Sequence, residues 1–485
     1  FTDTQGEKIY YGNYEFDKEC ITNRDRMFDC PQNLRAEEMF EVPQWAANKV
    51  VYQIFPSRFA TTQPVDKELW YKAPITPMDD LHGNLRGIIE HLDYIKDLGI
   101  DVVYLTPIFK SNSCHKYDTI DYYQVDPSFG TTEDLKELVQ KSHERGMKVV
   151  LDAVYNHTGR EFFAFQDILE KGEKSKYLDW YFIDELPPRG EWGEIPNFKC
   201  FGYYGGMPKL NLKNPEVEKY ITDVACYWIK ECDIDGWRLD VGDEISHFFW
   251  KNFRKAVKAV KKDMLIIGEI WHYAGDFLEG DEWDTVMNYP FYLNLIDLLA
   301  DEKITVSQFV QNLGYLKGRL HKNCYPLMWN LIDSHDTARF LHLCNDNKKK
   351  QHLAAAFQLL LPGMPMIYYG DEYAMPGAND PDCRRGMYWD EEYQDKEMYE
   401  WYKRLIQVRK SHACIVEGEL AGSVTEDEEG TVVLIRKNGE ETIAMIFNCS
   451  SSAKKFNEYT QKYNLLTENT FDGNVEGFDA AVIVL

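Results

Sequence analysis

Carboxylates follow several of the short apolar runs of this chain, at the point where each run ends. Three of them are Asp240, Glu269 and Asp336. Hydrolysis of a glycosidic bond uses two such acids, one that attacks or stabilises the sugar cation and one that protonates the leaving oxygen. The sequence therefore predicts this chemistry, provided that the acids converge on one cavity.

Two of these acids have neighbours that should set their protonation. Arg238 lies two residues before Asp240, on the same face of a predicted strand, so we expect its positive charge to keep Asp240 ionised. Glu269 is followed by Trp271, and aromatic surroundings should raise the pKa of the Glu269 carboxyl. This contrast favours Asp240 as the nucleophile and Glu269 as the acid and base.

A lone carboxylate at a strand end is more often a helix cap or a surface ion pair than a catalytic group. Here His157 and His335 accompany the acids and could donate hydrogen bonds to sugar hydroxyls. Burying so many polar groups without a function would cost several kcal/mol. A metal-dependent hydrolase would also use His and Asp, but no His-x-His pair ends the first apolar run, where Gln53 stands instead.

The elements that must position these residues alternate along the chain. From about residue 46 to 410, short β-branched runs alternate with amphipathic stretches such as 85–98, which is typical of repeated β/α units. Eight units predict an α/β fold, a (β/α)8 TIM barrel, with the active site at the carboxyl ends of its strands. The predicted strands are 50–55, 102–107, 149–155, 236–241, 265–271, 285–289, 327–333 and 364–369.

Two parts of the chain break this alternation. A stretch rich in Gly, Pro, Trp and Tyr follows the third strand and is too long for a loop, which predicts a small inserted domain. Near the C-terminus, alternating apolar and polar residues around turns such as Asn438-Gly439 predict an antiparallel β-domain. The predicted parts are an N-terminal segment at 1–45, the barrel at 46–157 and 213–412, the inserted domain at 158–212 and the β-domain at 413–485.

Composition argues against several kinds of partner. The net charge of −26 would repel nucleic acids and anionic membranes, and no apolar run reaches the length of a membrane helix. Most of the 11 cysteines are isolated, although Cys20 and Cys30 are close enough in sequence to form a bridge. Free thiols and the absence of a visible signal peptide predict a cytoplasmic protein.

Four motifs in order make the chain resemble the α-amylase family of retaining glycoside hydrolases, from about residue 45 onward. By this resemblance, Asp240 is the nucleophile, Glu269 the acid and base, and Asp336 the carboxylate that binds the hydroxyls of the cleaved sugar. The motifs are Asp152 with Asn156 and His157, Gly-Trp-Arg238-Leu-Asp240, Glu269-Ile-Trp-His272, and Ser334-His335-Asp336.

The resemblance also implies a set of sugar-binding residues. Arg238, His157 and His335 match residues around the cleaved sugar, Tyr117 matches a ring that stacks on it, and Asp380 and Arg384 match residues that bind the next sugar. The segment 207–211, Met-Pro-Lys-Leu-Asn, resembles a signature of neopullulanases, cyclomaltodextrinases and maltogenic amylases. Residues on the leaving-group side are then matched by Glu244, Trp271 and His272.

Enzymes of this group cut α-1,4 bonds in cyclodextrins, pullulan and maltooligosaccharides, sometimes with α-1,6 cleavage and transfer to a sugar. Alternative functions are an α-1,6-glucosidase, a sucrose- or trehalose-type transferase, and a catalytically dead binding subunit. The resemblance requires no cofactor but allows a structural Ca²⁺, because Asn156 matches a family ligand. The group usually carries an amino-terminal β-sandwich of roughly a hundred residues, and about 45 precede the barrel here, so the oligomeric state stays open.

Overall fold

The computed structural model describes residues 8–12, 15–22, 41–190 and 193–485, which fall in two compact units, 1–40 and 41–485. In the first unit, strand β1 (Tyr10–Gly12) pairs antiparallel with β2 (Glu15–Asp17). Cys30 lies outside the described residues, so the suggested bridge to Cys20 stays a prediction. Among the described residues, no helix is long and apolar enough to cross a bilayer.

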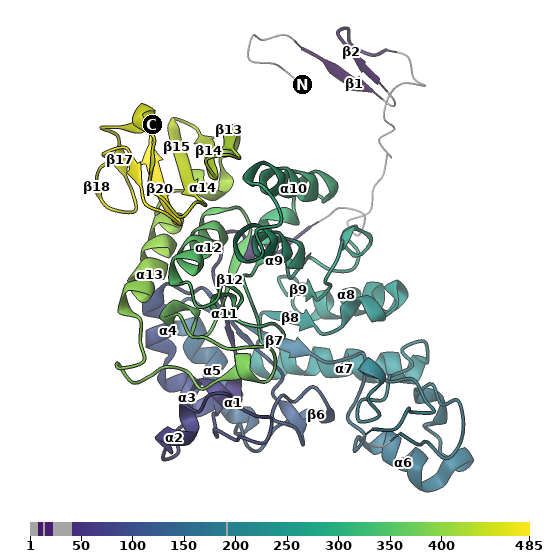
Figure 1. The fold of residues 1–485 in the computed structure, drawn as a ribbon. Helices are drawn as coiled ribbons and strands as arrows, with labels where there is room; N and C mark the ends of the chain where they lie inside the picture. Colours follow the sequence, from purple (N-terminus) through teal and green to yellow (C-terminus); the bar gives the residue numbers. More distant parts are fainter. Residues whose placement is uncertain (1–7, 13–14, 23–40, 191–192) are drawn as a thin grey trace. The chain divides into compact units, whose positions relative to one another are not determined.

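Eight parallel strands form the centre of the second unit, in the order β10-β9-β8-β7-β4-β3-β12-β11 (Figure 1). A parallel bridge between Met287 and Trp329 joins the two ends of this sheet, so the strands close into a barrel. The predicted TIM barrel is confirmed. The strands are β3 (Val51–Ile54), β4 (Val102–Leu105), β7 (Lys148–Ala153), β8 (Gly236–Leu239), β9 (Leu265–Gly268), β10 (Thr285–Val286), β11 (Trp329–Asn330) and β12 (Met364–Tyr368).

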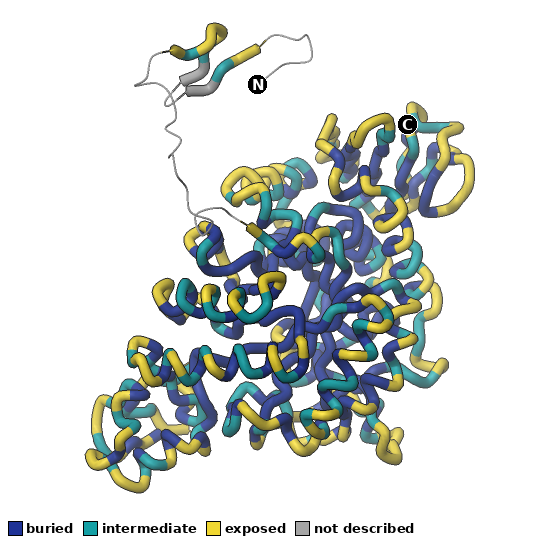
Figure 2. The backbone as a smooth tube through the Cα atoms, turned by 180° about the vertical axis from the view of Figure 1, so that it is seen from behind, coloured by how far each residue is buried: buried dark blue, intermediate teal, exposed yellow. Residues whose placement is uncertain are grey.

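Helices surround the barrel, and their inner faces are buried while their outer faces are exposed (Figure 2). Side chains that cap the helix starts explain where several helices begin. Thr131 and Asp134 form a capping box at the start of α5, and the hydroxyl of Ser246 caps α8. The principal helices are α3 (Leu85–Glu90), α4 (Leu92–Leu98), α5 (Thr132–Glu144), α7 (Pro215–Cys232), α8 (His247–Val260), α9 (Tyr289–Leu295), α10 (Val306–Arg319), α12 (Lys348–Leu360) and α13 (Lys396–Ser411).

Some elements are shorter than the sequence predicts. The stripe at 85–98 forms two helices, α3 and α4, which meet at His91, where φ is −104° and ψ is 8°. Strand β10 ends at Val286 because the Asn288 side chain accepts a hydrogen bond from the Phe291 amide and starts α9. The polar residues beyond each strand therefore lie on turns at the mouth of the barrel.

The segment inserted after β7 contains helix α6 (Phe163–Lys171) and short 3-10 turns. An antiparallel bridge between His157 and Lys209 joins this segment to the barrel. A second antiparallel bridge, between Tyr181 and Leu210, lies within the segment. The residues of this segment and the C-terminal sheet lie on opposite sides of the barrel (Figures 1 and 2).

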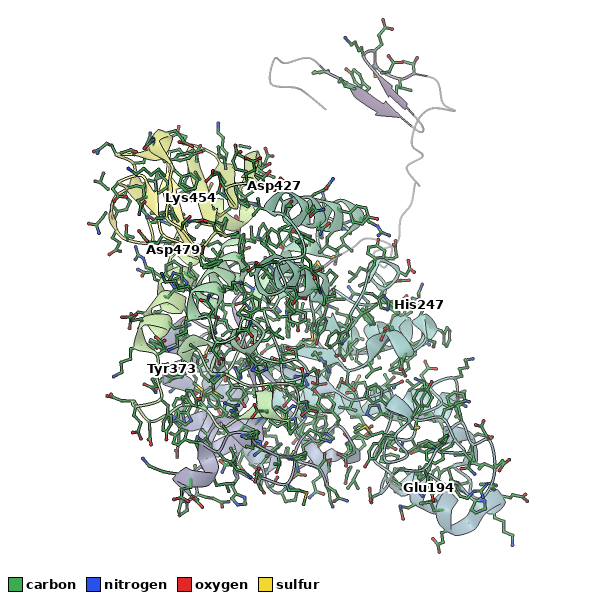
Figure 3. All side chains as sticks on the ribbon, in the orientation of Figure 1. Glu194, His247, Tyr373, Asp427, Lys454 and Asp479 are labelled. Carbon is green, nitrogen blue, oxygen red and sulfur yellow. The ribbon has the colours of Figure 1, made fainter. Side chains whose placement is uncertain are left out.

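The C-terminal sheet is antiparallel in its central strands, in the order β13-β14-β15-β20-β17-β18. It packs on the barrel through the Phe447 ring, which stacks on Phe357 with 4.2 Å between ring centroids. Asp427 and Asp479 bond to barrel helices α10 and α12 at two edges of this contact (Figure 3). The strands are β13 (Glu419–Glu426), β14 (Thr431–Asn438), β15 (Glu441–Asn448), β17 (Tyr463–Asn464), β18 (Asn469–Thr470) and β20 (Asp479–Val484).

Candidate active site

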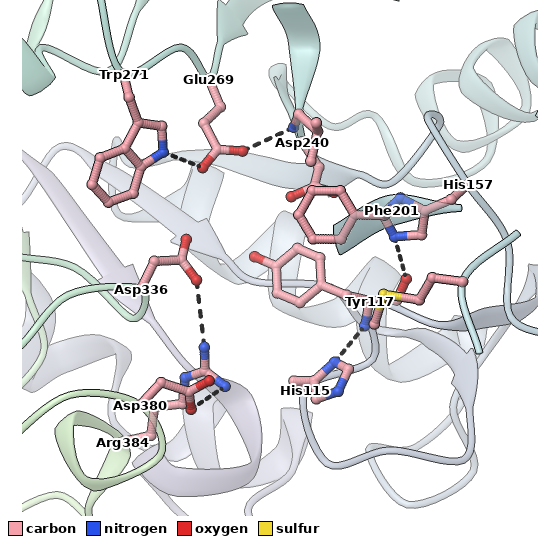
Figure 4. Close-up of a pocket in the computed structure, with 12 residues that line it drawn as sticks. His115, Tyr117, His157, Phe201, Asp240, Glu269, Trp271, Asp336, Asp380 and Arg384 are labelled. Atoms are coloured by element: carbon pink, nitrogen blue, oxygen red, sulfur yellow. Dashed lines mark hydrogen bonds and ion pairs between the residues drawn. The ribbon is translucent and has the colours of Figure 1, made fainter. Parts of the chain in front are cut away.

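A cavity of about 360 Å³ opens at the carboxyl ends of the barrel strands (Figure 4). Asp240 follows β8, Glu269 follows β9, and Asp336 follows β11, and all three line this one cavity. The three acids therefore converge as their positions at strand ends predict. The other lining residues are His115, Tyr117, His157, Phe201, Met207, Val241, Trp271, Asp380 and Arg384.

One buried guanidinium connects the acids beneath the cavity. Arg238 Nη1 lies 2.9 Å from Asp240 Oδ1 and 3.2 Å from Asp152 Oδ1. Its Nη2 lies 2.9 Å from Glu269 Oε1 and 3.9 Å from Asp336 Oδ2. Because Arg238 is fully buried, its charge is held in a fixed position under all of these carboxylates.

The backbone after Asp240 helps to orient Glu269. The Val241 amide donates to Glu269 Oε2 at 2.8 Å, and Trp271 Nε1 donates to Glu269 Oε1 at 3.3 Å. Val241 has a φ of 47°, a left-handed conformation that is strained for a β-branched residue. Asp240 Oδ2 has no hydrogen-bond partner among the described residues, so this oxygen is free to react.

Burial dominates the protonation of this cluster. It raises the pKa of Asp240 well above the usual range, it raises the pKa of Glu269, and it raises the pKa of Asp152 to about 6, while Arg238 opposes each rise. Arg238 lowers the pKa of Asp240, as the sequence interpretation expected, but burial raises it by more. One positive charge cannot balance three buried carboxylates, so the cluster retains a shared proton.

His335 lies beneath the cavity, fully buried, instead of lining it. Its Nδ1 accepts from Gln53 Nε2 at 2.7 Å, so its proton is on Nε2, which lies 2.6 Å from the Tyr117 hydroxyl and 3.1 Å from Asp336 Oδ2. Burial lowers the pKa of His335, which keeps the ring neutral. The Tyr117 hydroxyl then donates to Asp152 Oδ2 at 3.0 Å, and this chain of bonds fixes the Tyr117 ring.

His157 lines the cavity but is nearly fully buried, and burial lowers its pKa to about 4. Its Nε2 donates to the Tyr117 carbonyl at 3.1 Å, and its ring stacks on Phe201 with 5.1 Å between centroids. In this structure the neutral His157 therefore orients Tyr117.

Asp380 and Arg384 lie together at the cavity wall. Arg384 Nη1 is 2.8 Å from Asp380 Oδ1, and its Nη2 is 3.4 Å from Asp336 Oδ1. This places the two residues assigned to the next sugar directly beside the acid assigned to the cleaved one.

Besides Arg238 and His335, which lie beneath the cavity, two more predicted residues do not line it. His272 is largely exposed, and its Nε2 lies 3.3 Å from Asp243 Oδ2. Glu244 Oε2 lies 2.8 Å from the ammonium of Lys209. Glu244 follows β8 and His272 follows β9, but neither side chain lines the cavity.

Several lining residues were missed by the sequence interpretation. Phe201 and Met207 come from the inserted segment, whose sequence has no period that shows which residues face inward. Gln53 orients His335 without lining the cavity, and it was not predicted as a site residue. It lies inside the first predicted strand, 50–55, and nothing in that apolar run marks its polar tip as part of the site.

The residues around Asn156 do not fit a calcium ion. Asn156 Oδ1 accepts a hydrogen bond from the Lys209 ammonium, which also lies 2.8 Å from Glu244 Oε2 and 3.2 Å from the Glu244 carbonyl. The oxygens that would bind a cation therefore already face a positive charge. In the described ranges, no group of three or more His, Cys, Asp or Glu side chains could hold a metal ion.

A family description, "Alpha amylase, catalytic domain", matches residues 53–418, which include the whole cavity. The chain belongs to the α-amylase family. It is 45% identical over 452 residues to a cyclomaltodextrinase of Geobacillus thermopakistaniensis, covering 92% of this chain and 76% of that protein. It is 42% identical over 416 residues to an intracellular maltogenic amylase of Bacillus subtilis, covering 85% and 70%.

A solved cyclomaltodextrinase structure superposes with a TM-score of 0.91 at 38% identity and covers 99% of this chain and 85% of that one. The chain is thus a glycoside hydrolase of the α-amylase family that acts on α-glucans. The resemblance drawn from its four motifs is confirmed.

Proposed function

We propose that the protein hydrolyses α-1,4 bonds in cyclodextrins and short maltooligosaccharides, with retention of configuration at the cleaved carbon. The observation that carries this proposal is that Asp240 and Glu269 line one cavity and bind two nitrogens of one guanidinium, each at 2.9 Å. The names of its relatives, cyclomaltodextrinase and maltogenic amylase, support the substrate class.

Two displacements at one carbon account for retention. Asp240 Oδ2 attacks the anomeric carbon while the bond to the leaving oxygen breaks and Glu269 gives that oxygen its proton. A water molecule then transfers a proton to Glu269 and attacks the same carbon, which breaks the bond to Asp240. We expect the two carboxyl groups to lie roughly 5 to 5.5 Å apart, as this mechanism requires.

The other lining residues position the sugar in this proposal. Tyr117, held from below by His335, gives the cleaved sugar a ring on which to stack. Asp336 binds its hydroxyls, and Arg384 and Asp380 bind the next sugar. Each of these groups is fixed by a neighbour, so the site is ordered before the substrate arrives.

The test is chromatography of the products from β-cyclodextrin, pullulan and starch side by side. We expect β-cyclodextrin to be opened and cut to short maltooligosaccharides, and Glu269→Gln to abolish this. Cleavage confined to α-1,6 bonds, or to sucrose or trehalose, would overturn the proposal in favour of the alternative enzymes. No release of nitrophenol from a nitrophenyl maltoside would favour the dead binding subunit.

We further propose that the protein works in the cytoplasm. Supporting this are the nine cysteines of residues 41–485, all free, and the name of the intracellular maltogenic amylase of Bacillus subtilis.

A further inference from the structure

A second cavity, of about 420 Å³, lies beside the first, between helices α9 and α10 and the turn that follows β9. Trp271 lines both cavities. One face of its indole stacks on Tyr289, with 3.9 Å between ring centroids and 15° between the planes. Trp271 is nevertheless 41% exposed, so part of a fixed aromatic surface stays open between the two cavities.

Two more aromatic rings and a cation also line the second cavity. The Arg319 guanidinium carbon lies 3.8 Å from the Tyr273 ring centroid and 5.1 Å from that of Tyr315. Arg319 Nη1 donates to the Tyr315 hydroxyl at 3.0 Å, and the Tyr273 hydroxyl donates to the Arg319 carbonyl at 3.0 Å. These bonds hold all three side chains in one array, although Tyr315 is 65% exposed.

The amides between these walls are already satisfied. Asn312 Nδ2 donates to Asn294 Oδ1 at 2.8 Å, and Asn294 Nδ2 donates to the Phe309 carbonyl at 3.1 Å. Leu293 is 45% exposed on the same surface. The cavity thus presents flat apolar faces with polar groups at their edges, which suits the C–H faces and hydroxyl rims of pyranose rings.

The position of these residues relative to the catalytic acids indicates which side of a bound glucan they would contact. Trp271 Nε1 donates to Glu269 Oε1, so the second cavity begins next to the group that protonates the leaving oxygen (Figure 4). Asp380 and Arg384 line the first cavity only and are absent from the second. A glucan that crosses the acids therefore passes over Trp271 with its leaving-group side.

We propose that Tyr273, Tyr315 and Arg319 form an outer binding site for the leaving-group side of longer α-1,4-glucans, and for the acceptor sugar when the glycosyl group is transferred. This inference rests on the proposed function, because it takes Glu269 as the acid. Beyond Trp271, it assigns Tyr273, Tyr315 and Arg319 to the selection of longer glucan chains.

Binding and kinetics test this site together. In a Glu269→Gln background, calorimetry compares maltohexaose with maltotriose, and the same substitutions in the active enzyme give kcat/KM for both sugars. We expect Tyr315→Ala to weaken maltohexaose binding roughly three- to tenfold and to lower its kcat/KM by a similar factor, with little change for maltotriose. Arg319→Ala should act in the same direction because it removes the guanidinium that contacts both rings.

Tyr463→Ala is the matched control, since Tyr463 is a half-exposed tyrosine of the C-terminal sheet, on β17. It should leave both sugars unaffected. Equal effects of Tyr315→Ala on both sugars, or none, would overturn the outer site while leaving the hydrolase proposal intact. So would a loss of self-association on Tyr315→Ala with sugar binding unchanged, because the surface would then be a protein interface. A wild-type enzyme inactive on every glucan would instead overturn the proposed function.

Discussion

The catalytic acids share a single positive charge. Arg238 contacts Asp152, Asp240 and Glu269, and burial raises the pKa of all three carboxyls. Such a cluster gives the reaction a proton that Glu269 can deliver, but it holds negative charge away from water at a cost to folding. Activity and stability should therefore change in opposite directions when one acid is neutralised.

Asp240→Asn tests this directly. We expect kcat to fall by roughly three orders of magnitude or more, because the nucleophile is lost. The pKa of Asp240 is raised in the folded state. Below about pH 4 the carboxyl is neutral in both the folded and the unfolded protein, so its contribution to stability is fully present. That contribution is lost as the pH rises through the folded-state pKa. The Tm of the variant should thus equal or exceed that of the wild type at pH 7.

The Tm difference should shrink as the pH is lowered toward about 4, where both side chains are neutral. Thermal melts of both proteins across this range measure it. A variant that melts lower than the wild type at pH 7 would mean that Arg238 stabilises the ionised carboxylate by more than its burial costs.

Lys209 gives a second prediction about single residues. Its ammonium satisfies Asn156 Oδ1 and pairs with Glu244, so we expect neither EDTA nor added Ca²⁺ to change the Tm of the wild type. Lys209→Met should destabilise the protein by about 1 to 3 kcal/mol, because it leaves the buried Asn156 oxygen without its donor. Melting curves with and without chelator decide, and a fall in wild-type Tm with EDTA would show a metal site elsewhere.

The acids of the site could be predicted because each ends a strand that is visible in the sequence, and parallel strands bring their carboxyl ends together. The residues that orient these acids could not be predicted from the sequence. Gln53 and Tyr104 lie inside apolar runs, where a polar tip has no pattern of its own. Phe201 comes from a segment without periodicity, and only tertiary packing brings it to His157.

At the scale of elements, the same contrast holds. The eight barrel strands and the C-terminal β-domain were predicted because alternation or apolar runs, as in β14, β15 and β20, mark buried faces. Strand β13 was missed because most of its residues are exposed, so its sequence shows no buried face. The break at His91 was missed because the apolar period continues across it, from α3 into α4.

The position of the C-terminal end of β9 depends on the close packing of Gly268 against the ring of Trp283. A Cβ on Gly268, directly before Glu269, would lie 2.1 Å from the ring of the fully buried Trp283. Gly268→Ala should therefore cost about 1 to 3 kcal/mol of stability. It should also lower kcat by roughly a hundredfold, because the strand end must shift and carry Glu269 with it.

Gly314→Ala on α10 is the matched control, because a Cβ there meets nothing within 4 Å. It should leave kcat unchanged and raise stability by about 0.5 to 1 kcal/mol, since Ala favours a helix more than Gly does. Melting curves and kcat of both variants are compared. An active and fully stable Gly268→Ala variant would mean that Trp283 can move aside.

At the scale of the whole molecule, helices α10 and α12 of the barrel contact the C-terminal sheet. The Phe447 ring stacks on Phe357, the Ser307 amide donates to Asp427 at 2.9 Å, and His352 lies 3.0 Å from Asp479. None of these contacts borders the catalytic cavity. The predicted borders of the parts, at 157/158, 212/213 and 412/413, stay predictions, but these contacts favour unfolding of the barrel and the sheet together.

Phe447→Ala tests that coupling. Both rings of the stack are fully buried, so the substitution should cost about 3 to 5 kcal/mol. If the parts unfold together, calorimetry shows one transition that moves to lower temperature, and kcat below that temperature is unchanged because the acids are remote. Leu420→Ala on β13, a half-exposed position, should change stability by no more than about 0.5 kcal/mol. Two transitions, with the barrel melting as in the wild type, would mean instead that the sheet is an independent domain and that the stack of Phe447 on Phe357 does not stabilise the barrel.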